Sequence, residues 1–289
     1  MKLFERYNEA LRRSEDVTIL QLNRILDNSF NRLIRRTRIQ IRSGKPAADR
    51  NMALLQEFRQ LVPAFNPQRT DAYDRVLRGL LRSSQQKGIG VARDSMRELT
   101  PSRRRIGVSI PIEATVAAAA QSKGYLRRHG ETFAETATEL VAQGVAEGRP
   151  TDVITNDLRL RLGVVKSRAD VIARTESLRA YNNASNQYYA ANGIDLVMWY
   201  ATSDDRTCPI CNARAARIYK RAETQAPCHP RCRCYLAPWD PEIAQIDPGY
   251  ADLPRRHREE VSKVATVGPA DLNKAAVFEQ FAPQPFDSL

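Results

Sequence analysis

All five cysteines of this 289-residue chain, and one of its three histidines, lie between residues 207 and 238. Two tetrapeptides in this stretch share one form, Cys208-Pro-Ile-Cys211 and His229-Pro-Arg-Cys232. A turn begun by proline can bring the first and last side chains of such a tetrapeptide together. A tetrahedral zinc ion takes four soft or borderline ligands, typically as two such pairs. The spacing therefore predicts a zinc site formed by Cys208, Cys211, His229 and Cys232.

Two further cysteines leave alternative ligands open. Cys234 could take the place of Cys232, and Cys228 could take the place of His229. Disulfides are the competing interpretation, but the cysteine count is odd and the first residues are charged where a secretory signal has an apolar run. Because four protein ligands fill the coordination sphere, we expect the zinc to be structural rather than catalytic.

The net charge of +12 is concentrated in one part of the chain. Residues 1–105 carry 23 Lys and Arg against 11 Asp and Glu, which accounts for the whole excess. Such a segment is typical of proteins that contact the phosphates of nucleic acid, although a solvated helix face is an equally good interpretation. No run of eighteen apolar residues occurs, so we expect no membrane span. The candidate phosphate contacts are Arg32, Arg35, Arg36, Arg38, Arg42, Arg103, Arg104 and Arg105.

Hydrophobic periodicity predicts a chain that is mainly helical. From Leu20 to Ile34, apolar residues recur at steps of three and four, as in a helix that buries one stripe. Glycine and proline divide the pattern further, with Gly163 expected to separate two helices. We expect helices over 1–42, 48–61, 70–82 or beyond, 112–128, 131–146, 151–162 and 168–192, and strands over 195–201, 216–220 and 234–237.

These elements predict three regions. Residues 1–105 would form a basic helical region, ended by Thr100-Pro101-Ser102 and the arginine run that follows. Residues 106–240 would form a small α+β zinc-bearing module with its core at 168–239. Residues 241–289, rich in proline and poor in periodic apolar residues, are expected to be an extended tail.

Three motifs follow one another in the second region. Ile172-Ala173-Arg174-Thr175-Glu176 is followed by Asn182, then Trp199 precedes the segment 202–207, and His229-Pro-Arg-Cys-Arg-Cys234 closes the series. With the Cys-x-x-Cys pair, this order resembles the phage head morphogenesis family typified by the Mu F protein. The resemblance covers about 110–240. It implies structural roles for Arg174, Thr175, Glu176, Asn182, Trp199, Asp205 and Arg206.

The resemblance implies a structural minor capsid protein of a tailed bacteriophage. Such a protein is made in the host cytoplasm and is found in the virion, inside the head near the portal vertex. Its implied partners are the portal protein, other head proteins and packaged double-stranded DNA, with a role in head assembly and in genome packaging or ejection.

Two other classes stay open from the sequence. One is a zinc-dependent protein that binds nucleic acid without sequence preference outside a virion. The other is an enzyme carried in the head, such as a nuclease or a toxin-like transferase, with Arg174, Glu176 and His229 as its site. We expect no enzyme, because the sequence spells out no nucleophile–base pair and the histidine is better used as a ligand.

Overall fold

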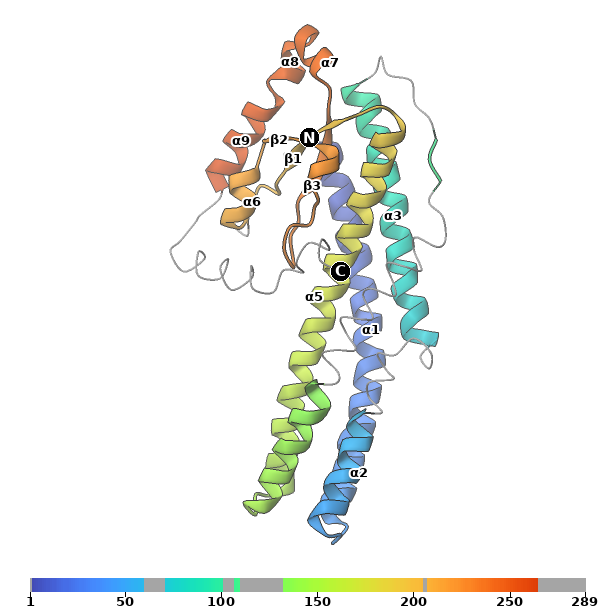
Figure 1. Cartoon of the computed structure of the whole chain (residues 1–289), viewed down its shortest axis with the longest axis vertical. Helices are drawn as coiled ribbons and strands as arrows, with labels where there is room; N and C mark the ends of the chain where they lie inside the picture. Colours follow the sequence, from blue (N-terminus) through green and yellow to red (C-terminus); the bar gives the residue numbers. More distant parts are fainter. Residues whose placement is uncertain (1, 60–70, 101–106, 110–131, 205–206, 265–289) are drawn as a thin grey trace. The chain divides into compact units, whose positions relative to one another are not determined.

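The computed structural model describes residues 2–59, 71–100, 107–109, 132–204 and 207–264 (Figure 1). This part of the chain is mainly helical with one small sheet, which confirms the predicted fold class. The predicted helix at 112–128 lies outside the described residues. The helices are α1 (Lys2–Arg42), α2 (Ala47–Arg59), α3 (Asp71–Leu99), a helix over residues 132–146, α5 (Thr151–Ala191), α6 (Pro209–Arg214), α7 (Pro241–Ile246), α8 (Pro248–Ala251) and α9 (Leu253–Val264).

Two of the long helices continue through glycines, and the prediction that Gly163 separates two helices is wrong. α5 is unbroken at Gly163, so the two helices predicted over 151–162 and 168–192 are one. α3 likewise runs through Gly88 and Gly90. A glycine inside a helix costs only about 1 kcal/mol, which packing on either side readily offsets. At Gly88 the small residue is required, because an added Cβ would lie 2.1 Å from the carbonyl oxygen of Tyr181.

The sheet has three antiparallel strands in the order β2-β1-β3. They are β1 (Leu196–Tyr200), β2 (Ile218–Lys220) and β3 (Tyr235–Trp239), close to the three predicted strands. Every residue of β3 is buried, as are the last four of β1, which fits their near-continuous apolar sequence. β1 and β3 therefore belong to the protein core, and β3 lies at one edge of the sheet.

The chain divides into two compact units built from discontinuous segments. Unit 1 comprises Met1–Arg13, Leu81–Pro111 and Arg174–Leu289, and unit 2 comprises Ser14–Leu80 and Ile112–Ala173. The three regions predicted at 1–105, 106–240 and 241–289 stay a prediction. Sequence breakers suggested those boundaries, whereas the long helices α1, α3 and α5 each contribute residues to both units.

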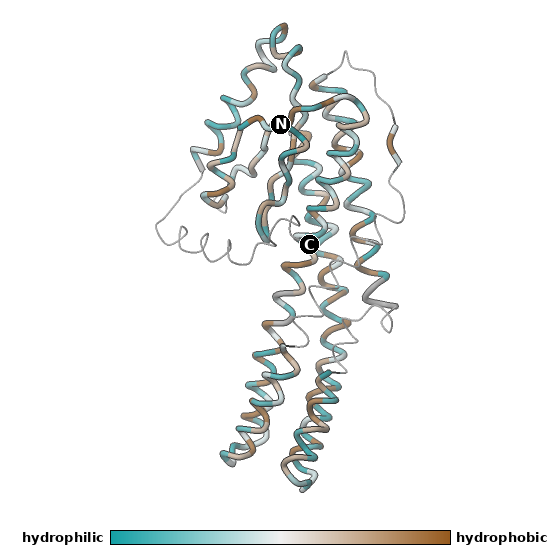
Figure 2. Tube along the Cα trace, viewed as in Figure 1, coloured by the Kyte–Doolittle hydropathy of each residue, from teal (hydrophilic) through white to brown (hydrophobic). Residues whose placement is uncertain are grey.

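Unit 2 is held by apolar stripes of its helices. α1 buries Leu22, Leu26 and Phe30, the residues that the periodicity assigned to its inner face. Phe58 of α2 packs edge-on against Phe133 with ring centroids 6.2 Å apart. Figure 2 shows hydrophobic and hydrophilic segments alternating along the trace of these helices. This is the pattern by which helices bury one face each.

The first part of the predicted extended tail is helical. Asp240 and Asp247 are the N-caps of α7 and α8, each followed by a proline at the first helical position. The Tyr250 ring stacks on Trp239, and its hydroxyl donates to the Pro238 carbonyl oxygen at 3.2 Å. Tyr250 therefore packs the start of the predicted tail against β3, and residues 265–289 lie outside the described part.

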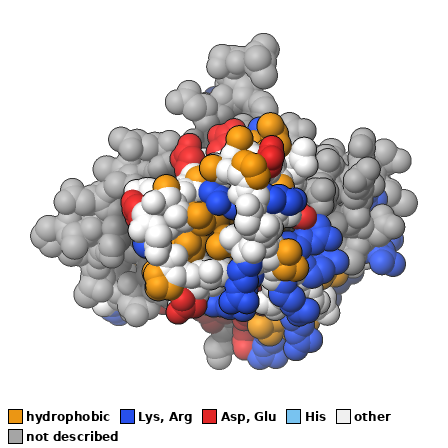
Figure 3. All heavy atoms as spheres, turned by 90° about the horizontal axis from the view of Figure 1, so that it is seen from below, with side chains coloured by type: hydrophobic (Ala, Val, Ile, Leu, Met, Phe, Trp, Pro, Cys, Tyr) orange, Lys and Arg blue, Asp and Glu red, His pale blue; other side chains and the backbone are white. Residues whose placement is uncertain are grey.

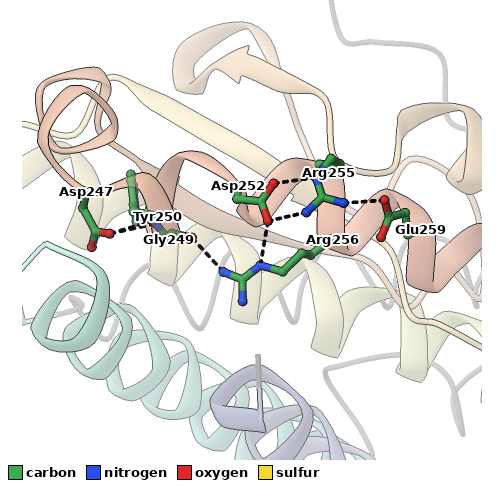
Figure 4. A network of polar contacts seen from close by, with 7 residues as sticks. All are labelled: Asp247, Gly249, Tyr250, Asp252, Arg255, Arg256 and Glu259. Atoms are coloured by element: carbon green, nitrogen blue, oxygen red, sulfur yellow. Dashed lines mark hydrogen bonds and ion pairs between the residues drawn. The ribbon is translucent and has the colours of Figure 1, made fainter.

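The joint between α8 and α9 is fixed by a small network of charges (Figure 4). Asp252 accepts from the guanidinium of Arg255 at 2.6 Å and also pairs with Arg256. Arg256 donates to the Gly249 carbonyl oxygen at 2.7 Å, and Arg255 also reaches Glu259. These exposed pairs link the end of α8 to the first turns of α9, and each contributes little free energy.

Across the described residues, none of the helices has both the length and the apolar content that crossing a bilayer requires.

Candidate metal centre

The cysteines and His229 come from two elements of unit 1. Cys208 is the N-cap of α6, with Pro209 at the first helical position, and its Sγ accepts a hydrogen bond from the Cys211 amide at 3.4 Å. A proline at this position suits a helix start because it fixes φ and lacks the N–H that would otherwise be orphaned. Cys228, His229 and Cys232 lie in the loop before β3. The two tetrapeptides thus face each other across a short gap.

Four ligand atoms lie within 4.8 Å of one another, from Cys211, Cys228, His229 and Cys232. The Cys211 sulfur is 3.0 Å from His229 Nε2 and 3.7 Å from the Cys232 sulfur. A tetrahedral zinc ion with Zn–S bonds of about 2.3 Å separates its sulfur ligands by about 3.8 Å. The cluster could therefore hold a metal ion of this size.

The group of four overlaps with the predicted set without being identical to it. Cys211, His229 and Cys232 belong to both, and Cys228 joins them as an additional ligand instead of replacing the histidine. Cys208 is outside the group of four, although its sulfur is 3.1 Å from His229 Nε2. Cys234 is buried and also outside it. The choice between Cys208 and Cys228 stays a prediction.

Hydrogen bonding within the cluster redistributes its protons. The hydrogen bond with the Cys211 thiol and the interaction with His229 together lower the pKa of Cys208 to about 4, against the opposing effect of burial. Burial lowers the pKa of His229, but bonds to Cys208 and Cys232 prevail and raise it to about 10. The pKa of Cys211 is raised, because its neighbouring thiols share its proton. A cluster of thiols favours a bound cation, because the cation binds the sulfurs as thiolates in place of their protons.

The imidazole of His229 is oriented for ligation. Its Nδ1 lies 2.8 Å from the Pro230 carbonyl oxygen, to which it can only donate. With Nδ1 donating to the carbonyl, Nε2 is the nitrogen whose proton a metal ion would replace, and its lone pair would then be the metal ligand. The backbone of its own loop therefore selects the tautomer that a metal needs.

The loop that carries the ligands is tied to the neighbouring turn. The guanidinium of Arg233 binds both carboxylate oxygens of Asp204, one of them at 2.6 Å. The hydroxyl of Thr202 donates to the Arg233 carbonyl oxygen at 2.7 Å. A bidentate pair of this kind fixes direction as well as distance. The turn after β1 and the ligand loop thus hold each other in place.

The motif residues of α5 lie against the same loop. Thr175 Oγ1 accepts from the Arg231 amide at 3.3 Å, and the Asn182 side chain bonds to the backbone of Cys234 and Leu236. Arg174 is half-buried on the same helix. Glu176 is 4% exposed, and burial raises the pKa of its carboxyl although the ion pair with Arg179 opposes this.

Trp199 is fully buried in the core of unit 1, with the guanidinium of Arg214 5.2 Å from its ring centre. This fits a core position next to α6. Asp205 and Arg206 lie outside the described residues.

The candidate phosphate contacts on α1 belong to unit 2. Arg32, Arg35, Arg36 and Arg42 are exposed, and Arg38 is half-buried. Arg36 is engaged with Glu57 of α2 at 2.6 Å. The other three candidates, Arg103, Arg104 and Arg105, lie outside the described residues.

One residue of unit 1 that the sequence did not single out is His257 of α9. It is fully buried, stacks on Tyr200 at 3.9 Å, and its Nε2 accepts from the Ala201 amide at 3.1 Å. The signal was present in the spacing Leu253, His257, Val261, which places the histidine on the apolar face of a helix. Its neighbours Arg255, Arg256 and Arg258 obscured that signal, because together they look like a solvated basic patch.

Comparison with known proteins gives one match. Residues 135–237 match the family described as Phage Mu protein F like protein. No curated protein and no solved structure matches the chain. The matched range begins in the helix over 132–146, includes all the motif residues of α5, and ends in β3 after the last cysteine. It lies within the range of about 110–240 that the ordered motifs indicated. Over residues 135–237 the chain therefore matches the Phage Mu protein F like family, as is consistent with a Mu F-like phage head morphogenesis protein.

Proposed function

We propose that this chain is a structural minor head protein of a tailed phage, with a zinc ion that fixes its ligand loop. The observation that carries the proposal is the family match, which ends at the strand following the cysteine cluster. The proposed location is inside the head near the portal vertex. The proposed partners are the portal protein, other head proteins and packaged DNA.

Zinc is the proposed metal because of the donor atoms. Three thiols and one imidazole are the ligand set of many structural zinc sites, and they leave no open position for a reacting water. A bound zinc ion would replace thiol protons and cross-link α6 to the loop before β3. Because that loop has little regular secondary structure, the cross-link would stabilise its conformation.

The contacts of the motif residues favour a structural role over a catalytic one. Glu176 is paired with Arg179, and both ring nitrogens of His229 are occupied by the cluster and its own loop. A general base needs a free position facing a substrate. An enzyme built on Arg174, Glu176 and His229 is therefore the weaker proposal.

Contact with packaged DNA would use exposed arginines of α1. Arg35 and Arg42 are seven residues apart, so they project from one side of the helix, with Arg32 one turn before Arg35. Figure 3 shows Lys and Arg side chains gathered on one side of the face that it presents, interspersed with hydrophobic side chains. Such a surface would bind phosphates without reading bases, and its affinity would fall with salt.

Replacing Arg32, Arg35 and Arg42 by alanine tests the DNA contact. Each lost phosphate contact is expected to reduce the slope of log affinity against log salt by about 0.9. A matched control removes the same charge elsewhere, at the exposed Arg159, Arg161 and Arg217. Equal binding curves for the two triple variants would argue against an α1 interface.

Mass spectrometry of purified particles tests the location. We expect this chain in few copies relative to the portal subunit, and we expect crosslinks from it to the portal. Absence from particles, with recovery from the host lysate on nucleic acid, would instead favour the nucleic-acid-binding protein outside a virion.

A further inference from the structure

We propose that α5 positions the loop that carries the metal ligands, and that Asn182 and Thr175 are the residues of α5 that do so. They hold the backbone of residues 231–236 so that the ligands are in place before the metal arrives. The inference rests on the proposed function, because it presupposes that the cysteine cluster binds a metal ion.

The two side chains share one face of α5. Asn182 follows Thr175 by seven residues, which is almost two helical turns, so both point the same way. Thr175 receives the Arg231 amide and Asn182 binds two groups further along the same segment. The earlier residue of the helix thus contacts the earlier part of the segment 231–236, and the later residue contacts its later part, next to β3.

Asn182 satisfies the backbone at the open edge of the sheet. β3 pairs with β1 on one side only. On its other side, the Cys234 carbonyl oxygen accepts from Asn182 Nδ2 at 3.2 Å, and the Leu236 amide donates to Asn182 Oδ1 at 3.3 Å. A side-chain amide offers one donor and one acceptor in the arrangement of a peptide group, so it takes the place of a neighbouring strand.

Asparagine is specifically suited to this position. The residue is 1% exposed, and the second proton of its Nδ2 is used by the Leu178 carbonyl oxygen at 3.1 Å. Cys234 and Leu236 are equally buried, so water cannot replace the amide. Aspartate would keep the acceptor for Leu236 but lose the donor for Cys234. A buried backbone group that loses its partner is costly, which makes this segment dependent on one side chain.

Thr175 fixes the turn that carries two ligands. Arg231 has a left-handed backbone with φ of 59°, which non-glycine residues adopt rarely. The turn is closed by the Cys232 amide, which donates to the His229 carbonyl oxygen at 3.2 Å. The threonine hydroxyl accepts from the Arg231 amide at the centre of this turn. It therefore stabilises the conformation that brings His229 and Cys232 to the same side.

The expected consequence is a preorganised metal site. Removing partners that orient metal ligands typically lowers metal affinity by about 10- to 100-fold. α5 itself should remain helical, because its main-chain hydrogen bonds are made between backbone groups and do not depend on these two side chains. The effect should therefore fall on metal binding more than on helix content.

The test measures zinc affinity of the full chain by competition with a chromogenic chelator. We expect Asn182→Ala to bind zinc about 10- to 100-fold more weakly than the unmodified chain. Asn183→Ala is the matched control, because Asn183 is the next residue of α5 and is exposed. Asn192→Ala is a second control, because Asn192 is buried and makes the same bond to the carbonyl four residues before it. The visible spectrum of the Co²⁺-loaded protein should change in Asn182→Ala and stay unchanged in both controls.

Different failures have different meanings. If the unmodified chain binds no zinc, the proposed metal site is wrong and this inference falls with it. If the unmodified chain binds zinc and Asn182→Ala binds it equally tightly with the same Co²⁺ spectrum, only the positioning role is overturned.

A second pair of variants covers the case in which Asn182→Ala does not fold. Thr175→Val removes only the hydroxyl, whereas Thr175→Ser keeps it. Weaker zinc binding in the valine variant, restored in the serine variant, supports the positioning role. Equal affinities in the two variants contradict it.

Discussion

The ligand loop of unit 1 and the helices of unit 2 are stabilised in different ways. In the loop, from Cys228 to Cys234, backbone groups are held by single side chains such as Thr175, Thr202 and Asn182. In unit 2, many buried apolar residues share the task along helices whose main-chain hydrogen bonds are internal. The loop therefore depends on a few specific atoms, whereas the helices depend on total buried area.

This difference predicts how each region responds to substitution. Loss of one atom in the loop should remove a ligand or leave a buried group without its partner, with large and local effects. A change in unit 2 should cost what the lost packing is worth. Both tryptophans lie in unit 1, so their fluorescence follows that unit, while far-UV circular dichroism follows the helices of both.

The largest effect is expected for Cys211→Ser. Cys211 contacts both His229 and Cys232, and metal binding contributes on the order of 10 kcal/mol in small structural zinc sites. We expect loss of bound zinc by elemental analysis, with new protease cleavage between residues 207 and 238, while the helices of unit 2 remain resistant. The control is Cys234→Ser, a buried thiol outside the group of four.

The same measurement decides the fourth ligand. Zinc should be lost from Cys228→Ser and kept by Cys208→Ser if the group of four is the binding set, and the reverse holds for the set first predicted. Unchanged zinc content in Cys211→Ser would show that Cys211 is not a ligand. Loss of zinc without new cleavage would show that the metal does not stabilise the loop.

Local patterns were enough to predict most of the fold. The apolar period from Leu20 to Ile34 predicted α1, and the apolar run before Ala201 predicted β1. The prediction of an extended segment over 241–264 is wrong, because prolines in this stretch begin helices. A proline that directly follows Asp240 or Asp247 is instead a helix start, since aspartate caps the helix and proline suits its first turn.

The site was predictable as far as sequence spacing fixes geometry. Cys-Pro-x-Cys and His-Pro-x-Cys identified Cys211, His229 and Cys232, because residues three apart in a turn must be close. Cys228 gave a weaker signal, since its place depends on the path of the loop. The role of Asn182 could not be predicted, because its partner Cys234 is 52 residues away and only the packing of α5 on β3 brings them together.

Phe58→Ala should affect unit 2 alone. Phe58 is fully buried and packs on Phe133, and truncating such a residue typically costs about 3–5 kcal/mol. We expect an earlier unfolding transition by circular dichroism, with an unchanged tryptophan transition and full zinc content. Met52→Ala on the same helix is the control, because Met52 is 62% exposed and its loss should cost less than about 0.5 kcal/mol. A shift of the tryptophan transition in Phe58→Ala would contradict separate stabilisation of the units.

Acid should weaken unit 1 through His257. Burial, together with the nearby positive charge of Arg258, lowers the pKa of His257 to about 4. The unfolded chain, with a pKa of about 6.5, therefore takes up the proton first as the pH falls. His257 should therefore not change the free energy of unfolding above a pH of about 6.5. Between pH of about 6.5 and 4 it should lower that free energy by at most about 3 kcal/mol.

Urea unfolding of the unmodified chain and of His257→Gln, followed by tryptophan fluorescence, measures this loss. The variant cannot titrate at this position, so the difference between the two proteins should shrink as the pH falls. Protonation of the metal ligands is common to both and cancels. A difference that stays constant from pH 7.5 to 4.5 would exclude His257 as a source of acid sensitivity.

The smallest effects should have opposite signs at two glycines of α3. At Gly88, in unit 1, a methyl group would meet the Tyr181 carbonyl oxygen at 2.1 Å and Ala184 Cβ at 3.0 Å. Because the obstacle is backbone, it cannot rotate away, and Gly88→Ala should cost about 1–3 kcal/mol in the tryptophan transition. At Gly79, in unit 2, nothing lies within 4 Å, so Gly79→Ala should stabilise the helix by about 0.5–1 kcal/mol. Equal changes in stability at the two positions would mean that α3 is packed alike in both units. The proposed difference, in which unit 1 depends on specific contacts and unit 2 on total buried area, would then be wrong.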